Sequence, residues 1–334
     1  MSAMMGMILG SKFVYGPTPV PVPTAGWYAS GRFGSPAARP YTATVVRITF
    51  ANDTVTASAA GSIPLARVYM AGTGNNTYGY YGGGMKAAAP VQVSTITRLT
   101  YSNSTATDVT PFAATINGAG ATGNQNYGWF GGGYQPGSPY SRSIVNRIDY
   151  SNDGTTPVTR GPLSIESTGF TASGSPSSGW WAGARNPGSI TSSNSSRITY
   201  ANDTDTAVTK GPLFTAVWGQ ASASDDTTYV WYVGGANAIF STPSINSSRV
   251  SRLTMANDTP QMSSRGPLVA ARYYLTGTTN YTYGWFGGGY QYPSVIYARV
   301  DRITYANDTV NTTGTGIGNL GSSRVWHASS SGLQ

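Results

Sequence analysis

Cysteine is absent from this sequence of 334 residues, and histidine occurs only once, at His327. The lack of cysteine excludes disulfide bonds and thiolate metal sites, so the fold must be stabilised by packing. No run of residues approaches the roughly 20 apolar positions that a membrane-spanning helix requires. The apolar start, Met1–Gly10, lacks the basic segment that opens a secretion signal. We therefore expect no membrane span and no signal peptide.

Residues able to carry acid–base chemistry are scarce. Glu166 is the one glutamate, and the one adjacent pair of acids, Asp225 and Asp226, lies in a polar turn. Glycoside hydrolysis by paired carboxylates needs two convergent acids. His327 falls inside a predicted strand, where we expect it to be packed rather than to act as a base. The sequence therefore predicts a protein that is not an enzyme, with no catalytic residue, metal site or cofactor.

Glycine and aromatic residues are plentiful, with 43 glycines, 23 tyrosines and 8 tryptophans. Together with many Ser, Thr and Asn residues, this composition is typical of turn-rich β-structure. One phrase recurs six times: Arg, Ile or Leu, Thr or Asp, usually an aromatic residue, Ala or Ser, and Asn. The spacings between successive copies are 51, 49, 50, 55 and 50 residues. The arginines of the six copies are Arg47, Arg98, Arg147, Arg197, Arg252 and Arg302.

Two further phrases accompany each copy. An aromatic stretch that runs into glycines precedes it, most clearly at Tyr127–Gly133 and Tyr283–Gly289, and a Gly-Pro-Leu unit such as Gly161–Leu163 follows it. Each period thus contains about four short strands, as in the blade of a β-propeller. The stretch Val300–Tyr305 alternates in the manner of a half-buried strand. We predict an all-β fold, a six-bladed β-propeller with four-stranded blades.

Both ends of the chain indicate how such a ring closes. The first aromatic strand begins at Trp27, and the last residues, Arg324–His327, match Arg272–Leu275 of the preceding copy. A C-terminal strand that completes the N-terminal blade would remove two exposed edges. The predicted propeller spans residues 27–334. Residues 1–26 precede it as an extended arm, with prolines at positions 17, 19, 21 and 23.

The acids of the repeat lie in equivalent Asn-Asp turns, at Asp53, Asp153, Asp203, Asp258 and Asp308. Each copy supplies one carboxylate and one Asn, which is short of the six to eight oxygens that calcium takes. Structural Asx turns are therefore favoured. The repeated arginines are expected to bond carbonyls or the turn aspartate of their own or the next blade. The functional alternative is a ring of six arginines that captures an anion in the channel.

The net charge of +8 and the pI near 9.6 raise nucleic acid as a partner. The arginines are spread at regular intervals, however, and no basic run occurs. We therefore predict that the protein does not bind nucleic acid.

The six copies differ most in the loops that follow the glycines. Antiparallel strands place these loops on one face of the disc, which favours that face for recognition. The loops are residues 32–43, 85–94, 134–143, 185–195, 236–248 and 290–298. Their Tyr and Gln residues could bind a sugar or a protein, or could merely cover the strand ends. The candidate ligand-binding residues are Tyr134, Gln135, Tyr140, Tyr290, Gln291 and Tyr292.

The order of aromatic strand, glycine run, loop, arginine strand and Asn-Asp turn resembles the kelch repeat, without the usual Trp after the turn. The phrase Tyr283–Gly289, preceded by Arg265–Leu268 and followed by Arg299–Thr309, resembles repeat proteins of tailed bacteriophages, especially those of marine cyanobacteria. The resemblance covers about residues 27 to 330. It specifies the type of repeat more closely than the role.

This resemblance implies a virion structural or attachment protein in the tail, fibre or capsid decoration, assembled in the host cytoplasm. Its partners would be other virion proteins, reached through residues 1–26, and a host surface glycan. The arm could instead pack across its own propeller. The alternative function is a free lectin-like, carbohydrate-binding propeller that is not part of a virion.

Overall fold

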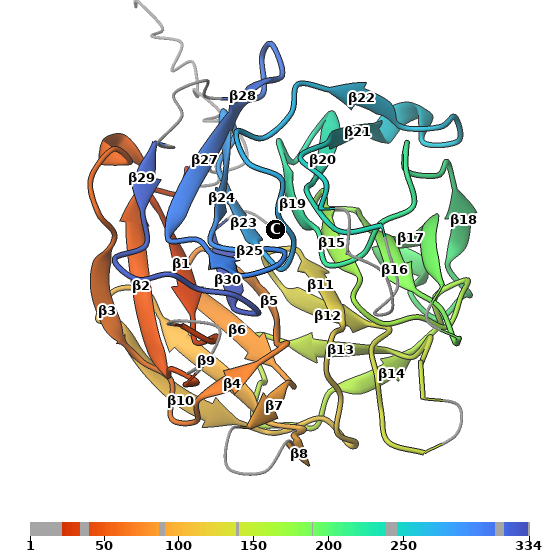
Figure 1. Ribbon diagram of the computed structural model, residues 1–334. Coiled ribbons are helices and arrows are strands. Elements are labelled where there is room, and N and C mark those ends of the chain that lie inside the picture. Colours follow the sequence, from red (N-terminus) through yellow and green to blue (C-terminus); the bar gives the residue numbers. More distant parts are fainter. Residues whose placement is uncertain are drawn as a thin grey trace, which may run out of the picture.

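The computed structural model describes residues 22–33, 40–86, 91–137, 140–188, 190–237, 246–310 and 317–332. Apart from three single-turn 3-10 helices, at Phe50–Asn52, Tyr200–Asn202 and Met255–Asn257, the regular structure of these residues is strand. Sheets surround a central region, and the C-terminal strand β30 lies beside it (Figure 1). The fold is all-β and propeller-like. No helix in these ranges is long and apolar enough to cross a membrane.

Antiparallel four-stranded sheets make up the body of the fold. Their strands, in the spatial order of each sheet, are as follows. The first sheet has β3 (Ser58–Ser62), β2 (Thr44–Thr49), β1 (Ala25–Ala29) and β30 (Ala328–Ser331). The second has β10 (Thr105–Val109), β9 (Ile96–Thr100), β6 (Tyr78–Gly82) and β5 (Ala71–Gly74). The third has β11 (Gly120–Gly123), β12 (Tyr127–Gly131), β13 (Val145–Asp149) and β14 (Val158–Arg160).

The fourth sheet has β15 (Thr171–Gly174), β16 (Ser178–Arg185), β17 (Thr191–Thr199) and β18 (Val208–Lys210). The fifth has β19 (Ala221–Ser224), β20 (Tyr229–Val233), β21 (Val250–Thr254) and β22 (Ser263–Arg265). The sixth has β23 (Thr276–Thr279), β24 (Tyr283–Gly287), β27 (Arg299–Thr304) and β28 (Thr309–Val310), and β29 (Gly318–Asn319) also pairs with β27. Short ribbons are formed by β4 (Arg67–Val68), β7 (Met85–Lys86) and β8 (Val91–Gln92), and by β25 (Tyr290–Gln291) and β26 (Val295–Ile296).

The two ends of the described chain meet in the first sheet, where β30 pairs with β1 from Ala29↔Ala328 to Gly26↔Ser331. The C-terminal strand begins one residue after the expected Arg324–His327, because Trp326 adopts a left-handed backbone, with φ of 59°, that ends extended structure before β30. β1 begins at Ala25, within the segment assigned from the sequence to the arm. Residues 1–21 of that arm lie outside the described residues.

The inner strands of the sheets are covered on both faces, whereas outer strands such as β10 and β14 are largely exposed. In β27, the alternation expected for a half-buried strand holds from Asp301 to Tyr305, but Val300, on the opposite face, is also fully buried. The reason is that side chains of adjacent sheets pack on each side of a sheet. Trp285 of β24, for example, stacks on Phe50 of the first sheet with ring centroids 3.9 Å apart. The hydrophobic core therefore lies mainly between neighbouring sheets.

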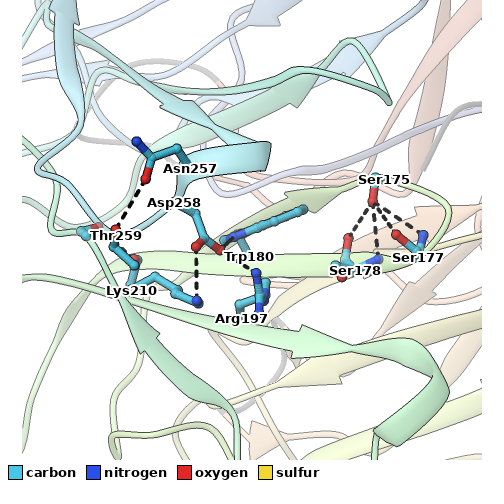
Figure 2. Close-up of polar contacts among 11 residues, drawn as sticks. Ser175, Ser177, Ser178, Trp180, Arg197, Lys210, Asn257, Asp258 and Thr259 are labelled. Atoms are coloured by element: carbon cyan, nitrogen blue, oxygen red, sulfur yellow. Dashed lines mark hydrogen bonds and ion pairs between the residues drawn. The ribbon is translucent and has the colours of Figure 1, made fainter.

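A repeated polar cluster, which we call the latch, joins neighbouring sheets. In Figure 2, the Asp258 carboxylate accepts hydrogen bonds from Trp180 Nε1 at 2.8 Å and from Arg197 Nη1 at 3.0 Å. Lys210 Nζ lies 3.0 Å from the other carboxylate oxygen. Trp180, Arg197 and Lys210 belong to the fourth sheet, and Asp258 follows β21 of the fifth. The latch therefore ties two sheets with charge-assisted bonds.

Five of the six repeated arginines take part in such a latch, each with the Asn-Asp turn of the next sheet. The pairs are Arg98–Asp153, Arg147–Asp203, Arg197–Asp258, Arg252–Asp308 and Arg302–Asp53. Each of these turn aspartates thus forms an ion pair between two sheets. The five arginines tie neighbouring sheets together rather than lining the axis.

The sixth position lacks its carboxylate. Arg47 faces a turn in which Ser104 stands at the place of the aspartate, and its guanidinium lies 5.9 Å from the centroid of the Trp27 ring. Trp27 Nε1 is buried without a hydrogen-bond partner, whereas the equivalent Nε1 of Trp285 donates to Asp53. The junction between the first and second sheets is therefore the one where the latch is incomplete among the described residues.

We expect Ser104→Asp to stabilise the protein by about 1 kcal/mol, because the new carboxylate would accept bonds from Arg47 and Trp27. Ser104 has a φ of 56° and the equivalent Asp308 has one of 57°, so the backbone already suits aspartate. Thermal unfolding should show a rise in Tm of roughly 2 °C. Ser102→Asp, at an exposed position of the same turn, is the control. An equal rise in both variants would indicate a general charge effect and contradict the missing latch.

Candidate functional site

One residue of each sheet contributes to a ring around the axis, which we call the collar. Each collar residue lies two positions before the innermost strand of its sheet, at the end of the sheet where the variable loops emerge. The six collar residues are Tyr69, Gly118, Gly169, Gly219, Tyr274 and Trp326.

The collar is held by main-chain hydrogen bonds. The N–H of every collar residue donates to the carbonyl of the collar residue in the adjacent sheet, with N···O distances of 2.6 to 3.3 Å. The order of donors is Gly118 to Tyr69, Tyr69 to Trp326, Trp326 to Tyr274, Tyr274 to Gly219, Gly219 to Gly169, and Gly169 to Gly118. This arrangement satisfies backbone groups that would otherwise be unpaired near the axis.

The collar conformation requires a positive φ, which ranges from 58° to 75° over the six residues. Glycine adopts this conformation freely, and three neighbouring collar positions are glycine. The other three are Tyr69, Tyr274 and Trp326, for which the left-handed backbone costs about 1–2 kcal/mol each. The fold at this position needs no aromatic side chain. A strained residue that the fold does not require points to a function.

The three aromatic collar side chains form one cluster. The Tyr69 ring centroid lies 4.9 Å from that of Trp326 and 5.7 Å from that of Tyr274, and Tyr274 lies 5.3 Å from Trp326. Trp218, which precedes collar Gly219, packs edge-on against Tyr274 at 5.1 Å. Burial raises the pKa of both Tyr69 and Tyr274 above the ordinary value. Their hydroxyls therefore stay protonated at neutral pH and can both donate and accept hydrogen bonds.

Two arginines from the variable loops flank this cluster. The guanidinium of Arg32 lies 4.8 Å from the Trp326 ring centroid, and that of Arg185 lies 4.6 Å from the Trp218 ring centroid. Both are cation–π contacts, which orient the guanidinium groups at the mouth of the ring.

A cavity of about 130 Å³ lies among the innermost strands and is lined at one end by the collar residues. Its wall is made mostly of small residues of these strands, such as Ala71, Ala121, Ala172 and Ala223. Since liquid water occupies about 30 Å³ per molecule, the space is that of a few waters or a small chemical group. An aromatic arc on one side of the mouth and glycines on the other make this opening asymmetric.

His327 lines the same cavity and is 2 % exposed. Burial, followed by the charge of nearby Arg324, lowers the pKa of its imidazole to about 3. An imidazole with this pKa is neutral and a poor proton acceptor at neutral pH. His327 immediately precedes β30 rather than lying within the closing strand as predicted.

The first group of predicted ligand residues lies on the third sheet. Tyr134 and Tyr140 stack with centroids 5.7 Å apart, and the main-chain N–H of Gln135 donates to the Tyr140 carbonyl. Arg142 Nε donates to Gln135 Oε1 at 2.9 Å. Tyr140 is 59 % exposed. This loop is therefore built around its own internal contacts and leaves one tyrosine accessible.

The second predicted group lies at the short ribbon of β25 and β26, which connects β24 and β27 of the sixth sheet. The Tyr290 hydroxyl donates to the Pro293 carbonyl, and Gln291 accepts a hydrogen bond from the Tyr297 hydroxyl. Tyr292 is 48 % exposed.

Tyr290 is the predicted residue that reaches the collar cluster, because its ring packs 5.5 Å from Tyr273, which precedes collar Tyr274. The three aromatic collar residues were missed from the sequence. The signal was present, since aligned copies show glycine in three repeats and an aromatic residue in three. That pattern does not reveal the positive φ of these residues. The positive φ is what makes the exchange of glycine for an aromatic residue informative.

At the opposite end of the innermost strands, Asp226 lies in the hairpin that follows β19. It is 8 % exposed, and its Oδ1 has no hydrogen-bond partner. Burial, and to a lesser extent the charge of Asp225, raises the pKa of this carboxyl from 3.8 to about 7. Asp226 thus destabilises the folded protein at pH values at which its carboxyl group must ionise.

We expect Asp226→Asn to stabilise the protein in a pH-dependent manner. Above pH 3.8 the unfolded carboxyl ionises while the folded one holds its proton, so the stability contributed by the raised pKa is lost between pH 3.8 and about 7. The amide escapes this loss. The Tm difference between variant and parent should be near zero at pH 4 and correspond to roughly 2–4 kcal/mol at pH 8. A difference that is the same at pH 4, 6 and 8 would indicate an ordinary pKa.

No family model matches this sequence, and no curated protein matches it. Solved structures do resemble the fold. One of them, described as "Structure of YjhT", aligns with a TM-score of 0.69 and 12 % sequence identity, over 88 % of this chain and 98 % of that chain. At this identity the likeness concerns the fold alone. It supports a propeller-like all-β architecture and carries no information on the ligand.

Proposed function

We propose that the sheets are the six blades of a single closed propeller. Three observations support this arrangement. β30 pairs with β1, which joins the two ends of the described chain in one sheet. The innermost strands contact one another in the order β30, β5, β11, β15, β19, β23 and again β30. The collar hydrogen bonds return to their starting residue after six steps.

The function that the site supports best is recognition without catalysis. The observation that carries it is the retention of Tyr69, Tyr274 and Trp326 at left-handed positions where glycine serves equally well in the other blades. These aromatic residues meet at the mouth of a rigid scaffold, on the face that bears the variable loops. Exposed faces of Tyr and Trp bind sugar rings and protein surfaces.

The proposed biological setting is the virion of a tailed bacteriophage, as a tail, fibre or capsid-decoration component. The support for it is the likeness of the repeat phrase, at Tyr283–Gly289 and its flanks, to phage repeat proteins. In this proposal residues 1–26 attach the chain to neighbouring virion proteins, and the loop face meets a host surface glycan. The second candidate is a free lectin-like propeller. The aromatic collar supports this candidate equally well, because sugar binding at the collar needs no virion partner.

Gradient sedimentation of purified particles tests the setting. We would add full-length protein, and a variant lacking residues 1–24, to particles devoid of the protein. We expect the full chain to sediment with the particles and the truncated chain, with an equal Tm, to remain in solution. If both proteins remained in solution, the proposal that the protein is a virion component would be rejected. If, in addition, soluble glycans raised the Tm, the lectin-like candidate would replace it.

A further inference from the structure

The charges of this protein are distributed unequally between its two faces. The latches and the turns away from the loops hold nine basic residues and nine acidic residues. The basic residues are the six repeated arginines with Arg160, Lys210 and Arg265. The acids are the five latch aspartates with Asp149, Asp205, Asp225 and Asp226. This half of the molecule therefore has no formal net charge.

The loop end holds nine basic residues and three acidic residues. Six of the basic residues belong to the variable loops or their borders, namely Arg32, Lys86, Arg142, Arg185, Arg249 and Arg299. The acids are Asp108, Glu166 and Asp301. Asp301 forms ion pairs with Arg272 and Arg299. The loop end thus carries a formal net charge of +6, and Lys12 and Arg39, which lie outside the described residues, supply the rest of the total of +8.

Three of the loop-end arginines are buried in the blades that carry the aromatic collar residues, where they bond groups of their own blade. Arg67, Arg272 and Arg324 are at most 2 % exposed, and each precedes an aromatic collar residue by two positions. The three blades with glycine in the collar have no arginine at this place. Buried charge and strained aromatic residue therefore occur together, in the same half of the ring.

Two of these buried cations are solvated by main-chain dipoles. Arg324 donates to the Thr44 carbonyl at 2.9 Å, and Arg67 donates to the carbonyls of Gly83 and Thr95 at 2.8 and 2.7 Å. Burial lowers the pKa of each guanidinium to about 10, so both remain charged at neutral pH. The protein interior screens their positive potential less than water does, although Asp108 offsets part of the potential of Arg67.

We propose that the collar mouth binds an anionic saccharide. The sugar ring stacks on the arc formed by Tyr69, Tyr274 and Trp326, and its carboxylate or phosphate faces the positive potential of the arginines, with Arg32 and Arg185 at the rim. This inference rests on the proposed recognition function and specifies its ligand class. A nucleic acid needs a track of accessible cations for successive phosphates, whereas the three buried arginines cannot reach any phosphate.

The experiment is a binding titration of the full chain with soluble oligosaccharides that bear uronate or phosphate groups. Each is paired with a neutral counterpart, such as the methyl ester of the same uronate. We expect at least one acidic oligosaccharide to bind, its neutral counterpart to bind about tenfold more weakly, and the difference to shrink at high salt. Equal binding of both members of every pair, or binding of none, would overturn the proposal. Tighter binding of single-stranded DNA would overturn it in favour of a nucleic-acid site.

Substitution locates the site. Trp326→Gly introduces the residue that three other blades carry at this place, so it should leave the Tm unchanged or raise it. The same substitution should weaken the binding of the acidic oligosaccharide about tenfold or more. Trp326→Phe should retain most of the binding, which guards against a folding defect of the glycine variant. Tyr140→Ala, at the exposed loop tyrosine, is the matched control and should alter binding less than about twofold.

The converse result, loss through Tyr140→Ala and none through Trp326→Gly, would place recognition on the loops. It would reject the collar site and leave the proposed recognition function standing. Sedimentation with particles without any saccharide binding would likewise reject this inference alone.

Discussion

A chain that lacks residues 321–334 is expected to lose its cooperative thermal transition or to unfold at a Tm lower by about 15 °C or more. The deletion removes β30, which pairs with β1 and contacts both β5 and β23, and it removes Trp326 from the collar. One edge of β1 and the inner faces of two sheets would then meet water. Differential scanning calorimetry and far-UV circular dichroism measure the effect.

Complementation makes this test specific. A synthetic peptide of residues 321–334, added to the truncated chain, should restore the transition in a concentration-dependent manner, because binding to the folded form alone raises stability. A peptide of scrambled sequence should have no effect. A truncated chain that melts at the Tm of the full chain would contradict the closed ring.

Asp258→Asn should destabilise the protein by roughly 2–4 kcal/mol, or about 5–10 °C in Tm. The substitution leaves Arg197 and Lys210, whose side chains are 29 % and 10 % exposed, without their carboxylate. Partial exposure of the arginine keeps the loss below that of a fully buried pair. Thermal or urea denaturation provides the measurement.

Two comparisons test the interpretation of this latch. Asp153→Asn should cost less, because Asp153 forms an ion pair with one cation, Arg98, beside its hydrogen bond from the Tyr80 hydroxyl. Asp205→Asn, in an exposed turn, should change stability by no more than about 0.5 kcal/mol. Losses of equal size at all three positions would mean that the latch contributes no more than any surface aspartate.

Local patterns in the sequence predicted the strands well, because the repeat places Arg147, the glycines after Tyr127 and the Asn-Asp turn at fixed intervals, and each has a local structural cause. The all-β, propeller-like architecture with four-stranded antiparallel sheets follows directly from them. The alternation expected along Val300–Tyr305 holds from Asp301 onward and fails at Val300, because adjacent sheets cover both faces of β27. That covering is a property of the assembly of sheets, and a single strand does not encode it.

The site was harder to predict because its residues are united by backbone conformation. Tyr134 and Tyr290 attract attention as aromatic residues in variable loops, and the structure finds them engaged mainly in their own loops, on different sheets. Tyr274 and Trp326 resemble ordinary strand residues in the sequence. Only their positive φ and their mutual contact identify them as a group.

The collar has an electrostatic consequence for any ligand at the mouth. Its six peptide groups are linked head to tail in a circle, so the components of their dipoles along the circle largely cancel. A helix terminus, by contrast, sums its dipoles into a fixed partial charge. The backbone of the collar therefore favours neither cations nor anions, and the sign preference of the mouth is set by replaceable side chains. Exchange of a few loop-end arginines would then be sufficient to invert that preference without disturbing the ring.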